Sequence, residues 1–414
     1  MKTLELAALA KQASRQVRTL SDEVRTGVLN LFAEQLLSRK AEILEANAED
    51  LRAAEENGMS QAFLDRLRLT SARIDGIAQG VREIAAMEDP LHRVLEERAL
   101  SCGVYLKKLT VPMGVIGIIF ESRPNVSADC AALCFKAGSA CVLKGGRDSL
   151  RSCRALMAAM HAALAAYGVD ESAVVLLENP DREETNALMA DRRSVDLLIP
   201  RGSSRLIQAV VQHAKVPVIE TGAGVCHTFV DASADFAMAE NIVLNAKCQR
   251  PSVCNAMETL LVHEAVAEAF LPKMAEALAE RGVRIHGDEA SRRILPGILP
   301  ADEESFHTEY NDLEMNLRIV RDTDEAIRHI ETYGTHHSDC IVSETPEHVA
   351  KFMNGVDSAC VYHNASTRFT DGGVFGMGAE IGISTQKLHA RGPMGLAELT
   401  TYCWQVEGHG EVRS

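Results

Sequence analysis

The chain has 414 residues, a length that predicts more than one hydrophobic core. Hydrophobic residues make up 46% of it and charged residues 24%, which is ordinary for a globular protein. The formal net charge of −15 argues against a nucleic-acid binder, because a phosphate backbone requires a basic face. An anionic ligand would therefore depend on local Lys and Arg side chains and on helix N-termini.

The N-terminus and the cysteines indicate a cytoplasmic protein. The opening sequence MKTLELAALAKQASRQ lacks the apolar core and small-residue cleavage site of a signal peptide. No stretch reaches the roughly 18 apolar residues of a membrane span. The 11 cysteines are scattered without a CxxC pair, as suits a reducing cytosol. His329, His336 and His337 lack further ligands at zinc spacing, so no metal site is expected.

Residues 1–231 are predicted to form a helical N-terminal region and a first α/β domain. Apolar spacing predicts two long helices within residues 3–58 and another over 71–87, and a hairpin is predicted over 98–110. Beyond it, buried strands alternate with helices, which indicates a parallel sheet. The predicted strands are 111–120, 139–146, 174–178, 195–200 and 216–220, and the helices between them are 128–136, 149–166, 182–189 and 202–214.

The alternation restarts after residue 231 and predicts a second α/β domain over residues 232–367. Residues 368–414 are expected to form a Gly-rich return segment and a C-terminal strand near 399–406. The expected strands of the second domain are 257–263, 283–287, 316–320, 340–343 and 358–364, and its helices are 235–245, 264–281, 323–332 and 346–353.

The loop KCQRPSVCNA carries the cysteine best placed for chemistry, Cys254. Lys247, Arg250 and the neighbouring backbone amides could lower its pKa, and a thiolate is the attacking form of cysteine. Other cysteines lie in apolar patterns and are expected to be buried: Cys130, Cys134, Cys141, Cys340 and Cys360. Purely structural roles also remain open for several of these residues: a structural thiol for Cys254, solvent-facing strand ends for Lys144 and Glu220, and a turn for Asn125.

The order of motifs resembles the aldehyde dehydrogenase superfamily over nearly the whole chain. After the helical N-terminus and hairpin come PMGVIG, the loop ESRPNVSAD, the strand end VLK and the turn at Gly202-Ser203. Glu220 then precedes Cys254 by 34 residues, and a Gly-rich segment follows. The resemblance implies two doubly wound α/β domains, the first cofactor-binding and the second catalytic, plus a small β-hairpin for oligomerisation.

The resemblance also implies a role for individual residues. Cys254 would be the nucleophile, and Asn125 with the amide of Cys254 would form the oxyanion hole. The remaining implied roles concern the cofactor: Lys144 at the adenosine ribose, Gly202 and Ser203 near the phosphates, and Glu309 at the nicotinamide ribose.

Two departures from the family pattern refine this expectation. Where NAD-preferring relatives carry a Glu soon after the VLK lysine, this sequence has Arg147, which favours the 2′-phosphate of NADPH. Glu220 matches the residue that activates water in hydrolytic relatives. A reductase of acyl phosphates gains nothing from hydrolysing its thioester, so Glu220 would serve proton transfer or positioning, or point away.

The passages IFESRPNVSAD, KCQRPSVCNAMETLLVH, IPRGSSRLI and AIRHIETYGTHHSDCIVS resemble the branch of the superfamily that acts in proline biosynthesis. The implied reaction is NADPH-dependent reduction of L-glutamyl 5-phosphate to L-glutamate 5-semialdehyde and phosphate through a cysteine thioester. Arg123 and Arg250 flank catalytic positions and are candidates for binding the substrate's phosphate and carboxylate, with surface solvation as the alternative.

Two other functions stay open: a hydrolytic aldehyde dehydrogenase acting on a small aldehyde, and a catalytically silent assembly protein. The hairpin and the C-terminal strand have exposed edges. In the wider family the corresponding elements pair across subunits, so the resemblance implies a homodimer or homotetramer. The upstream glutamate kinase is a further candidate partner, whereas no nucleic-acid or membrane partner is expected.

Overall fold

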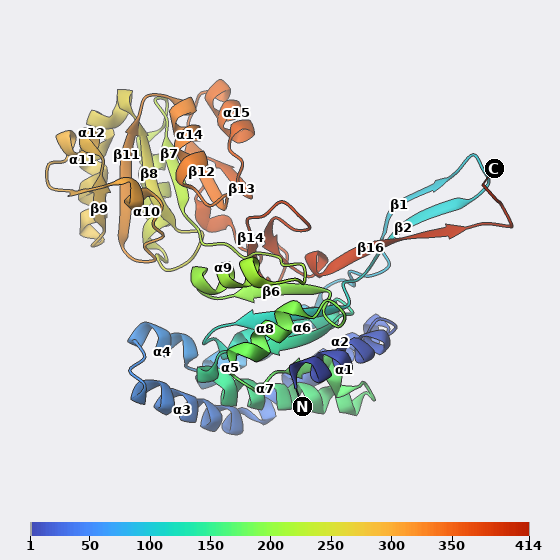
Figure 1. Ribbon diagram of the computed structural model, residues 1–414. Coiled ribbons are helices and arrows are strands. Elements are labelled where there is room, and N and C mark those ends of the chain that lie inside the picture. The colour runs from blue at the N-terminus through green and yellow to red at the C-terminus, as the bar shows by residue number, and fades with distance from the viewer. Residues whose placement is uncertain (1, 414) are drawn as a thin grey trace. The chain divides into compact units, whose positions relative to one another are not determined.

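The computed structural model describes residues 2–413 and forms two compact units (Figure 1). The first unit comprises the chain up to Glu220 with two later segments, Gly376–Gly382 and the chain from Met394 onward. The second comprises Thr221–Phe375 and Ile383–Pro393. Among the described residues, no helix is both long and apolar enough to cross a membrane.

The N-terminal region contains three long helices where two were predicted. These are α1 (Thr3–Val17), α2 (Asp22–Ser38) and α3 (Lys40–Glu56). The break between α2 and α3 is the single residue Arg39, without the Gly or Pro that would mark it in the sequence. Gly58, with φ of 75°, confirms the predicted end of α3. The short helix α4 (Gln61–Leu67) was not predicted, and α5 (Ser71–Ala86) confirms the expected helix.

The first unit is built on a four-stranded parallel sheet with strand order β5-β4-β3-β6. Its strands are β3 (Val115–Phe120), β4 (Ala140–Lys144), β5 (Val174–Leu176) and β6 (Leu197–Arg201). The helices between and after them are α6 (Pro124–Lys136), α7 (Leu150–Ala166), α8 (Arg182–Ala190) and α9 (Ser204–His213), with short 3-10 turns η1 (Arg147–Ser149) and η2 (Glu171–Ala173). The predicted parallel α/β domain is therefore confirmed.

The strand predicted over residues 216–220 is wrong. Only one isolated bridge, between Leu198 and Val218, represents it. The segment lies beside the edge strand β6, and Pro217 has no amide hydrogen to extend a ladder. A short apolar run alone could not reveal this.

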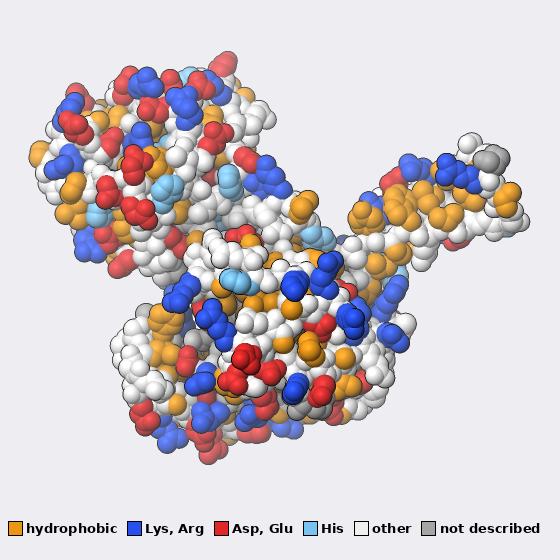
Figure 2. Space-filling model, viewed as in Figure 1, with side chains coloured by type: hydrophobic (Ala, Val, Ile, Leu, Met, Phe, Trp, Pro, Cys, Tyr) orange, Lys and Arg blue, Asp and Glu red, His pale blue; other side chains and the backbone are white. Residues whose placement is uncertain are grey.

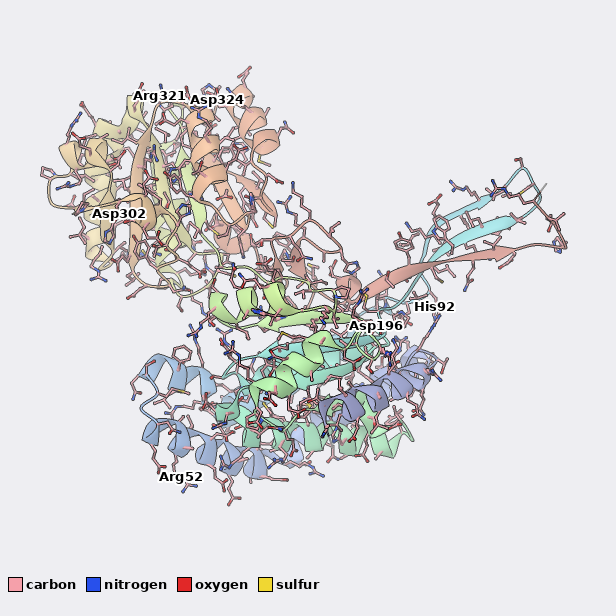
Figure 3. All side chains as sticks on the ribbon, in the orientation of Figure 1. Arg52, His92, Asp196, Asp302, Arg321 and Asp324 are labelled. Atoms are coloured by element: carbon pink, nitrogen blue, oxygen red, sulfur yellow. The ribbon has the colours of Figure 1, made fainter. Side chains whose placement is uncertain are left out.

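Asp196 fastens the first helix to the sheet of its unit. Its carboxylate accepts from Lys11 Nζ of α1 at 2.8 Å and from the amide of Val115, the first residue of β3, also at 2.8 Å (Figure 3). Asp196 thereby connects α1 to the first residue of the central strand β3.

A separate antiparallel sheet of three strands belongs to the first unit. It contains β1 (Val94–Ala99), β2 (Tyr105–Pro112) and β16 (Thr400–Glu407), in the order β1-β2-β16. The predicted hairpin is confirmed, with its first strand beginning earlier than residue 98. Hydrophobic side chains gather along this sheet (Figure 2), and the exposed ones are Val94, Leu95, Tyr402, Trp404 and Val406.

The second unit contains a seven-stranded parallel sheet in the order β10-β9-β11-β8-β7-β12-β13. The strands are β7 (Cys226–Val230), β8 (Met257–His263), β9 (Arg284–Gly287), β10 (Leu299–Pro300), β11 (Glu314–Val320), β12 (Ser338–Val342) and β13 (Cys360–His363). Because β7 pairs with both β8 and β12, the second unit begins at Thr221 rather than at residue 232.

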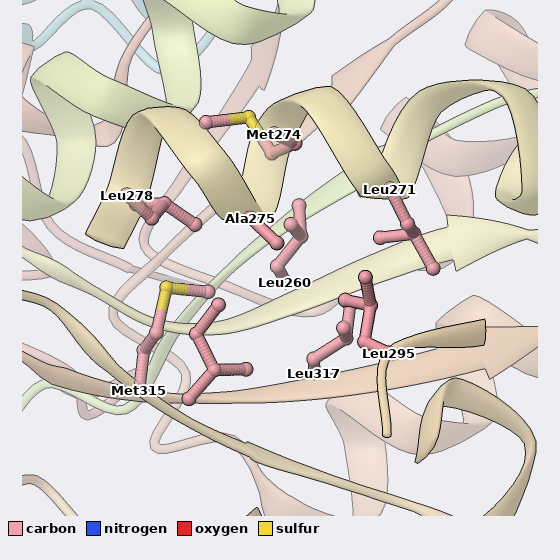
Figure 4. A pocket seen from close by; sticks show the side chains of 9 residues that line it. Leu260, Leu271, Met274, Ala275, Leu278, Leu295, Met315 and Leu317 are labelled. Carbon is pink, nitrogen blue, oxygen red and sulfur yellow. The ribbon is translucent and has the colours of Figure 1, made fainter. Parts of the chain in front are cut away.

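Helices cover this sheet and supply its apolar core. They are α10 (Phe236–Cys248), α11 (Glu264–Glu280), α12 (Glu289–Ile294), α13 (Glu303–Phe306), α14 (Thr323–Tyr333) and α15 (Pro346–Gly355). Leu271, Met274 and Leu278 of α11 face β8 and β11 across an apolar space without a polar group in its lining (Figure 4). Burying each such side chain stabilises the fold by about 1.5–3 kcal/mol. The remaining elements are β14 (Gly382–Ser384), β15 (Gly392–Met394), η3 (Thr367–Phe369) and η4 (Ala397–Leu399).

Candidate active site

Cys254 lies in the loop that joins α10 to β8, at the amino end of that strand. The two sides of the loop are tied together by an ion pair between Lys247 Nζ and Glu258 Oε2, at 2.8 Å and with both side chains fully buried. By its place in the sequence, Lys247 is expected to favour a thiolate at Cys254. In the structure Lys247 instead neutralises a buried carboxylate, and its main effect is on the shape of the loop.

The backbone carbonyl of Cys254 is held by Gly224 and Cys226, at the start of β7. A side-chain Cβ built on Gly224 would lie 1.4 Å from the carbonyl oxygen of Cys254, so only glycine fits there. The thiol of Cys226 donates to the same oxygen at 3.2 Å. Burial, together with the charges of Asp339 and Cys254, raises the pKa of Cys226 well above its usual value, so it acts as a neutral donor.

Glu309 joins the same part of the second unit. Its Oε1 accepts from the amide of Gly224 at 2.8 Å. The carboxylate therefore lies next to the backbone that contacts Cys254. This is compatible with the cofactor contact that the resemblance implies for Glu309, which stays a prediction.

Behind the cysteine, buried polar side chains form a continuous chain of hydrogen bonds. Asn255 donates from Nδ2 to the Thr370 carbonyl at 2.8 Å, and the Thr370 hydroxyl is 2.6 Å from both Ser338 Oγ and Tyr362 Oη. Ser338 Oγ in turn lies 2.9 Å from His337 Nδ1, which is 3.7 Å from the Cys226 sulfur. Burial lowers the pKa of His337 to about 4, so the ring is neutral near pH 7. Such a connected network rigidifies the residues it holds.

Arg368, on η3, is a residue of this site that the sequence analysis missed. It is half-buried, and its Nε donates to Gln249 Oε1 at 3.0 Å, in the Cys254 loop. In the sequence it lies 114 residues beyond Cys254 and within no distinctive spacing, so only tertiary contacts bring it there. Arg250, a predicted substrate ligand, is exposed in the same loop.

In the first unit, Lys144 ends β4 as a buried ammonium. Its Nζ donates to the Gly145 carbonyl at 3.3 Å, and no ion pair of this side chain occurs within residues 2–413. Burial lowers its pKa, against the more distant charges of Asp181 and Glu184, which raise it. A buried cation with one carbonyl partner has donors left for ligand hydroxyls or phosphates, and this fits the implied ribose contact.

The turn at Gly202-Ser203, which precedes α9, is hydrogen-bonded to the carboxylate of Glu121, the residue that follows β3. Glu121 accepts from the Ser203 amide at 2.7 Å and from its hydroxyl at 3.1 Å, and a Cβ on Gly202 would lie 2.5 Å from the same carboxylate. The expected position of cofactor phosphates near this turn stays a prediction. Arg147 is exposed at the start of η1, three residues after Lys144.

Asn125 lies in the first turn of α6 rather than in a loop, which corrects the sequence analysis. Pro124 occupies the first helical position, where its missing N–H costs nothing, and starts the helix four residues earlier than expected. Asn125 Nδ2 donates to Asp129 Oδ2 one turn later, at 3.1 Å. Burial raises the pKa of Asp129 to about 6, whereas the Asn125 hydrogen bond and the Arg201 charge lower it.

Arg123 immediately precedes α6 and is exposed, and Glu220 is half-buried at the end of the first unit's N-terminal segment. The predicted site residues are thus divided between the two units. The first unit contains Arg123, Asn125, Lys144, Arg147, Gly202, Ser203 and Glu220, and the second contains Arg250, Cys254 and Glu309.

The aldehyde dehydrogenase family profile matches residues 3–301, well over half of the chain. The chain belongs to the aldehyde dehydrogenase family. Family membership confirms the expected α/β fold, makes the protein an oxidoreductase and implies a nicotinamide cofactor.

Within the family the chain is similar to proteins of one kind. It is 50% identical over 410 residues to a gamma-glutamyl phosphate reductase of Carboxydothermus hydrogenoformans, covering 99% of both chains. It is 49% identical over 407 residues to one from Caldanaerobacter subterraneus, covering 98% of both. The crystal structure of a Thermotoga maritima gamma-glutamyl phosphate reductase superposes with a TM-score of 0.98, at 44% identity and 100% coverage of both chains. These matches confirm the branch of the superfamily that the sequence passages indicate.

A more distant relative supports the fold alone. The acetylating aldehyde dehydrogenase of Geobacillus thermoglucosidasius has a TM-score of 0.70 at 16% identity, covering 100% of this chain and 97% of the other. The architecture persists although the sequences have diverged.

Proposed function

We propose that this protein reduces L-glutamyl 5-phosphate to L-glutamate 5-semialdehyde and phosphate, with NADPH as reductant, in proline biosynthesis. The observation that carries the proposal is the Cys254 loop: a half-buried cysteine whose own carbonyl is fixed by Gly224 and Cys226. The near-50% identity to gamma-glutamyl phosphate reductases over the full chain supports the choice of substrate.

In the proposed reaction the Cys254 thiolate attacks the acyl carbon, the C–S bond forms, and the C–O bond to phosphate breaks. The amide of Cys254 and the side chain of Asn125 are the proposed donors to the oxyanion. The hydrogen-bond network around the loop supports the role of the Cys254 amide, because a donor must be in place before charge develops. Loss of one such donor costs about 10²–10³ in rate in other enzymes.

Lys144, Gly202, Ser203 and Glu309 are the proposed cofactor ligands, and Arg147 is proposed to select NADPH. A guanidinium at this position matches a 2′-phosphate and offers nothing to a bare ribose diol. When bound, the nicotinamide supplies the hydride that reduces the thioester. The C–S bond to Cys254 then breaks, which releases the semialdehyde and regenerates the thiolate.

Glu220 is proposed to position groups or transfer a proton rather than to activate water. A water-activating base would hydrolyse the thioester before reduction and waste the acyl phosphate. Arg123 remains a proposed substrate ligand on the first unit.

The assay that tests this function runs the reaction backwards. Reduction of NADP⁺ by glutamate 5-semialdehyde should depend on inorganic phosphate, because phosphate must take the acyl group from Cys254. A hydrolytic aldehyde dehydrogenase would reduce NADP⁺ equally well without phosphate, and a silent assembly protein would not reduce it at all.

Cys254→Ser should fold and bind NADPH but lose at least about 10³ in reductase activity, because serine is a poor nucleophile without a general base. Thermal shift with NADPH and steady-state kinetics measure the two properties. Cys248→Ser is the matched control: Cys248 is half-buried at the end of α10, burial raises its pKa, and its variant should keep activity. Near-normal turnover of Cys254→Ser would refute the nucleophile.

The three-stranded sheet is proposed to pair with a second copy of the chain, giving a homodimer or homotetramer. Its outer strands β1 and β16 both have a free edge within the described chain, and apolar side chains lie exposed along it. An association with the glutamate kinase that makes the substrate stays a prediction.

A further inference from the structure

The η3 segment is fastened across the Cys254 loop at both of its ends. Arg368 donates from Nε to Gln249 Oε1 at 3.0 Å, on the upstream side of Cys254. On the downstream side, Thr367 Oγ1 donates to the Asn255 carbonyl at 2.7 Å, and Asn255 Nδ2 donates to the carbonyls of Thr370 and Arg368 at 2.8 and 3.4 Å. Three hydrogen bonds thus hold the η3 backbone around Arg368 relative to Cys254, and a fourth holds the Arg368 guanidinium.

Arg368 is charged and half-buried, yet no carboxylate forms an ion pair with it in the part of the chain that the structure describes. Other arginines with low exposure do have one: Arg25 pairs with Asp89 at 2.7 Å, and Arg391 pairs with Asp357 at 2.8 Å. The nearby Asp371 is turned to its own loop, where its Oδ1 accepts from the amides of Gly373 and Val374.

Arg250 supplies a second guanidinium, and it directly follows Gln249, the residue that Arg368 contacts. Burial lowers the pKa of Arg368, and the charge of Arg250 lowers it further, whereas Cys254 and Asp371 raise it. Arg250 likewise has no ion pair among residues 2–413. Two cations brought together at the Cys254 loop, in a chain of net charge −15, form a locally positive site that attracts an anion.

We propose that Arg250 and Arg368 together bind the phosphoryl group of the acyl phosphate, and inorganic phosphate in the reverse direction. This inference rests on the proposed function. Two guanidiniums offer paired N–H donors that match phosphate oxygens. In the forward direction they hold the leaving phosphate as the C–O bond breaks. In the reverse direction they direct a phosphate oxygen at the thioester carbon, so that the C–O bond forms while the C–S bond breaks.

The test compares Arg250→Gln, Arg368→Gln, their double variant and Arg368→Lys in the phosphate-dependent direction. Each glutamine variant should raise the KM for phosphate by about 10- to 100-fold, with the double variant highest, because a hydrogen bond to a charged group is lost. The KM values for semialdehyde and NADP⁺ should stay within about twofold. Arg368→Lys should recover part of the loss, because it keeps the charge and loses the fork.

Arg281→Gln is the matched control. Arg281 is exposed like Arg250, and its charge reaches Cys248 at the start of the same loop, where it lowers that thiol's pKa. Its removal should leave the KM for phosphate unchanged. Circular dichroism and melting temperature verify that all variants fold.

A second readout does not need turnover. Inorganic phosphate should slow alkylation of Cys254 by iodoacetamide in the wild type and in Arg281→Gln, and should give no protection in the double variant. Phosphate-dependent wild-type activity with an unchanged phosphate KM in every arginine variant would overturn this inference alone. A rise in the semialdehyde KM instead would assign the arginines to the substrate carboxylate and also overturn it. A wild type that neither needs phosphate nor is protected by it would overturn the proposed function itself.

Discussion

Gly224 shows how strongly one residue without a side chain can constrain this site. Its backbone passes so close to Cys254 that an added Cβ would overlap the Cys254 carbonyl oxygen at 1.4 Å and the carbonyl carbon at 2.4 Å. The glycine serves close approach rather than an unusual turn, since φ at this position is not positive. The Cys254 backbone, and with it the thiol and the amide, is located by this contact.

Gly224→Ala should push the Cys254 loop away and reduce turnover by at least about 100-fold, since a misplacement of 1 Å at a reacting centre has an effect of this size. Steady-state kinetics and the alkylation rate of Cys254 measure the change. Gly76→Ala is the matched control: nothing lies within 4 Å of its added Cβ in α5, so activity should persist. Helix propensity should even stabilise that variant by roughly 0.5–1 kcal/mol. Equal activity of both variants would show that the close approach at Gly224 does not matter.

The buried Lys247–Glu258 pair is a second residue-scale feature that the sequence analysis interpreted differently. A lysine seven residues before a reactive cysteine suggests a charge that favours the thiolate. In the folded chain Lys247 instead forms a fully buried ion pair with Glu258, at 2.8 Å. Charges in a sequence do not reveal their partners, because the partner is chosen by folding.

At the scale of elements, α6 links the proposed oxyanion donor to an acid. Asn125 and Asp129 are one helical turn apart and therefore lie on the same face. When Asp129 is ionised it accepts from Asn125 Nδ2 and leaves the other N–H of the amide available. The sequence analysis predicted a loop here because the polar run ESRPN resembles a turn, and it overlooked that Pro124 begins a helix well.

Asp129→Asn should change how stability depends on pH. The folded-state pKa of Asp129, about 6, is raised above the ordinary value of 3.8 by burial. The folded protein therefore binds more protons between these values, and the stabilisation present at low pH is lost as the pH rises through about 6. Two pKa units correspond to about 3 kcal/mol. Asparagine cannot ionise, so the melting temperature of the variant relative to wild type should rise by about 2–3 °C between pH 4.5 and 7.5.

Glu178→Gln provides a control of opposite sign. Arg154 lowers the pKa of Glu178, so its stabilisation is present above the ordinary pKa and is lost at low pH. The melting temperature of this variant relative to wild type should fall as the pH rises toward the ordinary value of 4.5 and stay nearly level from there to pH 7.5, where that of Asp129→Asn rises. Parallel trends in the two variants would contradict the proposed role of the half-buried Asp129.

At the scale of the whole molecule, the three-stranded sheet is the part whose strand edges and apolar side chains stay exposed in a single chain. Every residue of β1 is exposed, and Tyr402 and Val406 of β16 are 52% and 58% exposed. Lys108 covers part of this face, with its ammonium 3.8 Å from the Tyr402 ring. Exposed apolar residues at two strand edges are typical of a surface that meets another chain.

Val406→Glu combined with Trp404→Glu should shift the protein from an oligomer to a monomer, because the interface would then bury unpaired carboxylates. Light scattering coupled to size exclusion gives the mass. Met353→Glu, on α15, changes an equally apolar residue that is 39% exposed and should leave the mass unchanged. A monomeric wild type, or a double variant with the wild-type mass, would refute pairing through this sheet.

Local sequence determined the elements with strong periodicity or buried strands. The strand 257–263 was predicted to the residue, and α5, β4 and α14 to within one or two, because burial pattern and end signals act within a few residues. The break at Arg39 and the missing strand at 216–220 lacked such signals. The motifs and their order also determined the family, since Cys254 and Asn125 are embedded in long distinctive passages.

Only the tertiary structure decided what surrounds the cysteine. Because both β7 and β8 are parallel strands of one sheet, the segments that precede them meet at its amino edge, and this places Gly224 and Cys226 against Cys254. Arg368 arrives there through η3, from more than 100 residues away in the chain. Sequence spacing carries no information about such contacts, because they depend on which strands become neighbours and on how loops pack at their ends. The proposed nucleophile Cys254 could thus be chosen from the sequence, whereas the residues that hold it and the proposed phosphate ligand Arg368 required the fold.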